Sequence, residues 1–182
     1  MKIEDGAGTG VFAKVDNEQR LRVLAVSEPV DRHVNISSQG QWSISITVTP
    51  TGANDYFFYL KNTSASTAYA ITDIRISSTV ATEITYEHVS GTPTYSGATD
   101  APITNRYLGS SRQPTVTCKY DTDITNLTSE GEIFFEECAN ADTRYKLSTS
   151  SNIIVPPGQA IAFKRVAATG AIRSIVSLTE LG

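Results

Sequence analysis

Strict alternation of apolar and polar residues is the feature that most constrains how this chain can fold. In the stretch "QWSISITVT", Trp42, Ile44, Ile46 and Val48 share one parity, and serine and threonine occupy the other. Successive side chains of a strand point to opposite faces, so a period of two is typical of a strand with one buried face. No stretch keeps the apolar spacing of an amphipathic helix over three turns. The chain is therefore predicted to be all-β.

Segments with the same strand character follow at short spacing along the rest of the chain. Residues 56–62, "YFFYLKN", are apolar on both parities until Lys61, which is typical of a strand covered on both faces. The other segments are "AYAITDIRIS", "TEITYEHV", "TVTCKYD", "EIFFEEC", "NIIV", "AIAFKRVA" and "AIRSIVSLTEL". About eight strands separated by turn signals predict an antiparallel β-sandwich, jelly-roll-like in type.

Three connections between these segments have recognisable turn or loop chemistry. In "PTGAND", residues 50–55, proline ends the strand and Gly52 is expected to take the positive φ of the turn. Pro156, Pro157 and Gly158 predict a hairpin between the strands at 153–155 and 160–166. Residues 90–102 are rich in glycine, proline and threonine, and they are predicted to form a long loop, either a functional tip or a flexible insertion.

Length and charge bound the class of protein. The chain has 182 residues and a net charge of −4. A domain of this size buries roughly 70% of the surface that its unfolded chain exposes, so one sizeable core is expected. Nucleic acid and anionic membrane are not predicted as partners, because binding them normally requires a basic excess. The sequence has no apolar run of about 18 residues and no secretory leader near its start, so we expect synthesis in a cytosol.

The first residues differ from the rest because they contain little that could form a core. Gly6, Gly8 and Gly10 alternate with small or polar residues, which makes ordering this segment costly in backbone entropy. Residues 1–19 are interpreted as an extended N-terminal arm and residues 20–182 as a single β-sandwich domain. The alternative is a disordered tail followed by a first strand of the domain at residues 21–26.

The candidates for catalysis are few. His33 and His88 are the two histidines, and neither sits in a pattern that supplies a nucleophile and an orienting group. The serines lie outside any nucleophile-elbow motif. The sequence therefore predicts a protein without enzymatic activity, catalytic residues or cofactor.

The acidic residues offer only a weak case for a metal site. Asp121 and Asp123 in "DTDIT" would project to one face of a strand, but calcium needs about six to eight oxygens and the rest of a calcium loop is missing. A solvated acidic turn is the preferred interpretation, and no metal is predicted. Glu136 and Glu137 are adjacent, so on a strand they face opposite sides and cannot form a carboxylate pair.

Cys118 and Cys138 are too few for a disulfide framework. Cys118 has the strand parity of Val116 and Tyr120, which predicts a buried thiol. Whether the two cysteines pair is left open, because a disulfide depends on the geometry of two neighbouring strands.

The opening also resembles a known group of proteins. The pattern "KIEDGAGTG-x-x-AKVD-x-x-x-RL-x-V-x-AV-x-EP" is similar to the beginning shared by many structural proteins of tailed bacteriophages, and "YFFYLKN" and "IIVPPGQAIAFK" resemble later segments of the same group. This resemblance implies a virion component, and within that class we favour a capsid decoration, or cement, protein. Such proteins are commonly compact β domains that sit as oligomers over the shell and grip it with extended segments.

The resemblance carries expectations about partners and contact residues. The major capsid protein is the expected partner, a homo-oligomer is expected with a trimer favoured, and the expected location is the capsid surface. Arm residues that are apolar or basic are the candidate capsid contacts. They are Lys2, Ile3, Val11, Phe12, Lys14, Arg20 and Arg22.

Two other functions stay open at this point. A tail, baseplate or head-fibre component would use exposed aromatic residues, for which Tyr95 and Tyr107 are candidates. A carbohydrate-binding β-sandwich needs aromatic platforms in a groove. Trp42 is the single tryptophan, and its parity with Ile44 and Ile46 predicts that it is buried, which argues against this use.

Overall fold

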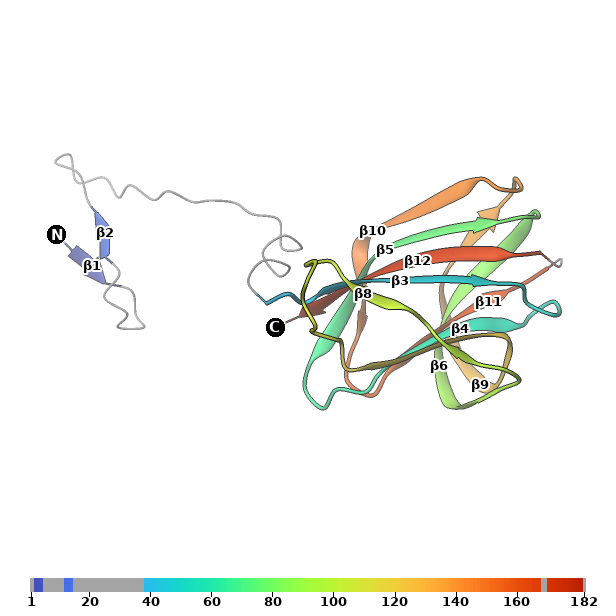
Figure 1. The fold of residues 1–182 in the computed structure, drawn as a ribbon, viewed down its shortest axis with the longest axis horizontal. Helices are drawn as coiled ribbons and strands as arrows, with labels where there is room; N and C mark the ends of the chain where they lie inside the picture. Colours follow the sequence, from blue (N-terminus) through green and yellow to red (C-terminus); the bar gives the residue numbers. More distant parts are fainter. Residues whose placement is uncertain (1, 5–11, 15–37, 168–169, 182) are drawn as a thin grey trace. The chain divides into compact units, whose positions relative to one another are not determined.

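Two five-stranded antiparallel sheets make up the larger of the two units of the chain (Figure 1). The structure is a computed structural model, and it describes residues 2–4, 12–14, 38–167 and 170–181. The units comprise residues 1–30 and 31–182. No helix occurs among the described residues. The prediction of an all-β fold is confirmed.

The strands of each sheet come from distant parts of the sequence. The first sheet has the order β10-β5-β12-β3-β8 and the second sheet has the order β4-β11-β6-β9-β7. The first sheet consists of β3 (Gln41–Val48), β5 (Ala68–Ser78), β8 (Ile103–Asn105), β10 (Arg144–Val155) and β12 (Ile172–Leu181). The second sheet consists of β4 (Tyr56–Asn62), β6 (Thr82–Tyr95), β7 (Thr99–Asp100), β9 (Val116–Cys138) and β11 (Ala160–Arg165).

The order of the eight long strands defines the fold more closely. Along the chain, β3, β5, β10 and β12 enter the first sheet, and β4, β6, β9 and β11 enter the second. Their neighbours run β3-β12-β5-β10 and β4-β11-β6-β9, which is the strand order of a jelly roll with two Greek keys. The predicted jelly-roll-like sandwich is confirmed.

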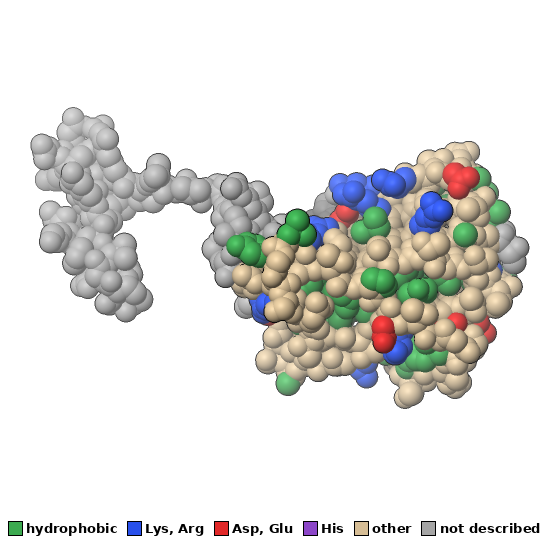
Figure 2. Space-filling view, in the orientation of Figure 1, with side chains coloured by type: hydrophobic (Ala, Val, Ile, Leu, Met, Phe, Trp, Pro, Cys, Tyr) green, Lys and Arg blue, Asp and Glu red, His purple; other side chains and the backbone are tan. Residues whose placement is uncertain are grey.

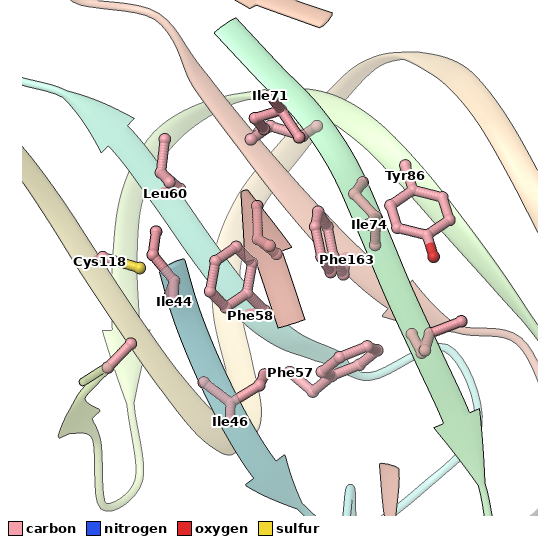
Figure 3. Close-up of a cluster of buried hydrophobic side chains, with 14 of the residues drawn as sticks. Ile44, Ile46, Phe57, Phe58, Leu60, Ile71, Ile74, Tyr86, Cys118 and Phe163 are labelled. Carbon is pink, nitrogen blue, oxygen red and sulfur yellow. The ribbon is translucent and has the colours of Figure 1, made fainter. Parts of the chain in front are cut away.

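The core lies between the two sheets. On β3 the apolar parity is buried, while Ser45 and Thr47 of the other parity are exposed, as the alternation predicted. Apolar side chains from both sheets meet in one cluster, in which Phe163 of β11 lies against Phe58 of β4 and Tyr86 of β6 (Figure 3).

The second sheet closes on itself. The first part of the long strand β9 pairs with β4 and its later part pairs with β6, while β11 pairs with both β4 and β6. These four strands therefore form a ring, and a second, smaller cluster containing Tyr59, Val89, Ile124, Ala160 and Ala162 packs on the face away from the main core. The closure explains why β4 is buried on both faces, as "YFFYLKN" predicted.

The Pro-Pro-Gly connection does not join the two strands of a hairpin. β10 ends at Val155 and pairs with β5 in the first sheet, whereas β11 begins at Ala160 and pairs with β4 and β6 in the second. The predicted hairpin is wrong, and residues 156–159 instead carry the chain from one sheet to the other. Gly158 takes a φ of 79° and its amide donates to the Asn62 carbonyl at 2.9 Å, which anchors this crossing.

The predicted loop at residues 90–102 is also wrong. β6 continues to Tyr95, and β7 follows after a short turn. The strand persists because it keeps pairing with β9 as far as Tyr95, opposite Ile124. At Gly91, with a φ of 98°, a side chain would meet the Asn126 carbonyl oxygen at 2.6 Å, so the absence of one lets the two strands approach.

The turn at residues 50–55 forms as predicted, with a different residue in the left-handed region. Asn54 takes the positive φ, 64°, in place of Gly52. The Asp55 carboxylate accepts a hydrogen bond from the Thr51 hydroxyl at 2.8 Å and another from the Gly52 amide. The buried guanidinium of Arg165 donates to the Gly52 carbonyl and fixes the turn to β11.

Residues 1–30 form the other unit. Its described part consists of β1 (Lys2–Glu4) and β2 (Phe12–Lys14), which pair antiparallel with Lys2 opposite Lys14. The pairing divides the predicted extended arm into two short strands and the residues around them. The proposed first strand at residues 21–26 lies outside the described residues, and the predicted boundary between residues 19 and 20 stays a prediction.

Trp42 provides a test of the core. Its side chain is fully buried, packs edge-on against Tyr69 at 6.1 Å between ring centroids, and donates from Nε1 to the Arg112 carbonyl at 3.0 Å. We expect Trp42→Ala to lower the free energy of unfolding by ~3–5 kcal/mol, because it leaves a large cavity and removes the hydrogen bond from the indole to the Arg112 carbonyl.

Urea unfolding of the purified protein would measure this loss. Leu108→Ala is the control, because Leu108 is 86% exposed and its truncation should change stability by less than about 0.5 kcal/mol. Equal effects of the two substitutions would contradict the burial of Trp42.

Candidate functional site

Of the two histidines, the structure describes His88. His88 is exposed on β6 and its Nε2 shares a hydrogen bond with Gln159 Oε1 at 2.8 Å. It has the parity of the buried residues Ile84 and Tyr86 but lies beyond the edge of the core. His33 lies outside the described residues.

Asp121 is buried in β9, so the predicted solvated acidic turn is wrong. Its carboxylate accepts hydrogen bonds from the amides of Ser96 at 2.7 Å, Gly97 at 2.9 Å and Thr122 at 2.6 Å. Burial opposes ionisation, but these amides and the Ser96 hydroxyl together hold the pKa of Asp121 below its ordinary value. The carboxylate therefore organises the turn between β6 and β7.

Asp123 lies two residues further along β9 and behaves in the opposite way. Burial, together with the negative charges of Asp55 and Asp121, raises the pKa of Asp123. Among the residues that the structure describes, no three His, Cys, Asp or Glu side chains gather as metal ligands would. Asp121 therefore serves the fold of the β6–β7 turn, whereas the side chain of Asp123 makes no hydrogen bond to the described residues of that turn.

A buried ion pair occupies the smaller cluster inside the ring of the second sheet. Glu87 is only 2% exposed, pairs with the Lys164 ammonium group, and accepts hydrogen bonds from the hydroxyls of Tyr56 at 2.5 Å and Thr85 at 3.2 Å. Burial opposes its ionisation, but bonds from Lys164, Tyr56 and Ser129 lower the pKa of Glu87. Both carboxylate oxygens are occupied, so this cluster is structural.

The cysteines are free thiols. Cys118 and Cys138 are both buried and not joined to each other, which confirms the buried thiol predicted at Cys118. Burial raises the pKa of both, that of Cys138 to about 11 with a further contribution from Glu136. Neither is therefore a reactive thiolate near neutral pH.

The aromatic candidates are divided between interior and surface. Trp42 is in the core, so it offers no platform for a sugar. Tyr95 packs against the smaller cluster, and burial raises its pKa to about 12. Tyr107 is exposed, next to the still more exposed Leu108.

The outer face of the first sheet carries a group of basic side chains that sequence reasoning missed. Its register places Arg144 of β10 and Arg173 of β12 on either side of Ser77 in β5, and Arg75 lies two residues along β5. Figure 2 shows blue side chains gathered over β10, β5 and β12. Arg75 forms an ion pair with Asp73, with 2.9 Å between Nε and Oδ2. The other carboxylate oxygen of Asp73 lies 3.8 Å from Lys146 Nζ.

These residues surround a depression of about 450 Å³. Serine is small, so the row Arg144–Ser77–Arg173 leaves a gap between two guanidinium groups. We call this the basic hollow and define it by five of its lining residues. They are Arg75, Ser77, Arg144, Arg173 and Ile175.

Two of the three arginines of the basic hollow could be placed on an outer strand face from the sequence. Arg75 lies between the buried residues Ile74 and Ile76, and Arg173 follows the buried Ile172, which places both arginines on the outer face of their strands. That Arg144 joins them depends on the pairing of β10 with β5, which no local pattern specifies.

Comparison with known proteins adds no identification. No family model matches the chain, and no curated protein matches it either. In the described part of the chain, no helix is long and apolar enough to cross a membrane.

The opposite behaviour of Asp121 and Asp123 gives a matched pair of variants. A lowered pKa means that ionised Asp121 stabilises the fold above the ordinary value of 3.8, a contribution lost as the pH falls through the lower folded-state pKa. At neutral pH we expect Asp121→Asn to cost about 1.5–3 kcal/mol, because several bonds to a charged acceptor are weakened.

Asp123→Asn is the control for this prediction. A raised pKa means that its charge opposes folding as the pH rises above 3.8, so its removal should be neutral or stabilising at neutral pH. Urea unfolding of both variants would measure the two effects at neutral pH and below pH 3.8. The difference between them should shrink at low pH, and a larger loss for Asp123→Asn at neutral pH would contradict this assignment.

Proposed function

We propose that the chain is a non-enzymatic virion structural protein that binds and stabilises a phage capsid shell as a decoration, or cement, protein. The observation that carries this proposal is the division of the chain into two units. Both sheets of the jelly roll are built between Gln41 and Leu181, and the described core extends from Trp42 to Leu178. In this proposal residues 1–30, the separate unit, make the contact with the shell.

The small size of the β1–β2 pair supports a binding role for this unit. Each strand has three residues, and a two-stranded hairpin alone in water is at best marginally stable. Contact with a partner would add the buried area that such a short pair lacks. The proposed partner is the major capsid protein, and the resemblance of residues 2–29 to phage structural proteins supports this choice.

Four of the seven proposed contact residues lie on the described strands of the N-terminal unit. Lys2 and Ile3 lie on β1, and Phe12 and Lys14 lie on β2. Val11, Arg20 and Arg22 lie outside the described residues. We retain all seven as proposed capsid contacts.

A homo-oligomer, with a trimer favoured, would present several such units to neighbouring shell subunits. Linked binding events raise the overall affinity far above that of one contact, provided that all can engage at once. We place the protein at the capsid surface, with no nucleic acid, membrane or cofactor in its role.

One observation favours a second candidate, a tail, baseplate or head-fibre component. Tyr107 and Leu108 are exposed side by side after β8, as a surface for host recognition would require. The number of copies per particle separates the two functions. Near parity with the major capsid protein, or a simple fraction of it, supports decoration, whereas a handful of copies supports the second candidate.

Deletion of Met1–Asp16 tests the role of the N-terminal unit. We expect the truncated protein to keep the circular dichroism spectrum and unfolding midpoint of the full chain, because both sheets begin after residue 40. Its binding to shells stripped of this protein should weaken by at least about tenfold, since the gripping segment is lost.

Co-sedimentation with stripped shells would measure the binding. Leu108→Ala in the full chain is the control, because it changes an exposed residue outside residues 1–30. Unchanged shell binding by the truncated protein, or its failure to fold, would contradict the proposed role.

A further inference from the structure

We propose that the basic hollow of one copy binds the acidic end of β9 of a second copy, so that the protein assembles head to tail. This inference rests on the proposed function only because it specifies how the copies of the proposed homo-oligomer bind one another. Two surfaces of the jelly roll have opposite charge, and on each surface a charged and an apolar residue lie at the same spacing.

The basic hollow has positive charge that the chain itself does not balance. Asp73 is engaged by Arg75, while neither Arg144 nor Arg173 forms an ion pair with another described residue. Asp142 on the rim is the one acidic side chain lining the depression. In a chain with a net charge of −4, this face therefore concentrates unmatched positive charge.

The hollow also has an apolar part. Ile175 lies two residues beyond Arg173 on the same face of β12, beside Arg75, and its side chain is 38% exposed. An occupant that fits the hollow therefore presents an anionic group and an apolar group about 7 Å apart, the distance of two residues along a strand.

The end of β9 presents these two groups. We call residues 130–137, "EGEIFFEE", the acidic segment. Glu132 and Glu137 are exposed and form no ion pair with a described residue. Between them Ile133 is 42% exposed and Phe135 is 56% exposed. Exposed aromatic and aliphatic side chains rimmed by charge are typical of a surface that binds a protein partner.

The spacing of the two surfaces matches. Phe135 and Glu137 are two residues apart on one face of β9, as are Ile175 and Arg173 on β12. Docking would place the Glu137 carboxylate between the guanidinium groups of Arg144 and Arg173, and the Phe135 ring against Ile175. Arginine favours such carboxylate contacts because its planar fork donates two hydrogen bonds.

The two surfaces belong to different sheets, so the contact joins unlike patches of two copies. A contact of this kind repeats from one copy to the next and closes into a ring when its rotation permits. A closed ring of three copies would be the trimer of the proposed function.

Charge reversal in the full chain tests the contact. Arg173→Glu and Glu137→Lys each place like charges together, and each should raise the dissociation constant of self-association at least about tenfold. The triple variant R144E/R173E/E137K restores opposite charges at every contact, because the lysine at 137 then lies between two glutamates, and it should self-associate more tightly than either single variant. Lys61→Glu, a reversal on β4 away from both surfaces, should leave association unchanged.

Sedimentation velocity over a range of concentrations, at low and high salt, would measure association. Circular dichroism would check that each variant is folded, which is expected because Arg144, Arg173 and Glu137 are all exposed. The wild-type assembly should weaken at high salt. A monomeric wild type, single variants that associate as the wild type does, or a triple variant no tighter than the single ones would overturn the proposal.

The same assay distinguishes other occupants of the basic hollow. If sulfated polysaccharide binds the wild type but not Arg173→Glu while the wild type stays monomeric, the hollow is an anion site for a different partner and the head-to-tail contact is wrong. Because no shell is present in this experiment, its failure is separate from a failure of the shell-binding test.

Discussion

The packing of aromatic rings around Phe163 is the interaction on which the rest of the structure depends. The Phe163 ring lies 4.6 Å from that of Phe58 and 4.6 Å from that of Tyr86. Phe163 is on β11, and the other two are on the strands that flank it, so these rings form the inner face of the second sheet (Figure 3). Aromatic rings bury large apolar areas, and the isoleucines of the first sheet pack against them. Because one face of each sheet packs in this core, the side chains of the other parity lie on the outward faces of the two sheets.

The interior also contains charged groups, and two buried carboxylates have structural partners. Glu87 is neutralised by Lys164 inside the ring of the second sheet, and Asp121 is surrounded by amides at the β6–β7 turn. Removing one partner of such a buried group leaves an uncompensated charge, so these residues are constrained by the fold. Exposed charges, such as those on β9 and on the outer face of the first sheet, are in contrast open to partners.

The proposed function combines the two units in one physical scheme. The jelly roll has its own core, the N-terminal unit is proposed to bind the shell, and the basic hollow and acidic segment are proposed to join the copies. Weak contacts of each kind become strong together because every copy is held at more than one place. The scheme requires no catalytic group, and the polar clusters inside the described domain already have structural roles.

The sequence by itself determined the fold class and the inner face of most strands. The alternation around Trp42 and the apolar run at residues 56–62 report burial directly, because the side-chain period of a strand is two. Only the tertiary structure decided which strands are neighbours. It placed β10 and β11 in different sheets, extended β6 to Tyr95, and put Arg144 and Arg173 on either side of Ser77. Pairing between distant strands depends on the packing of the whole core, which no local pattern contains.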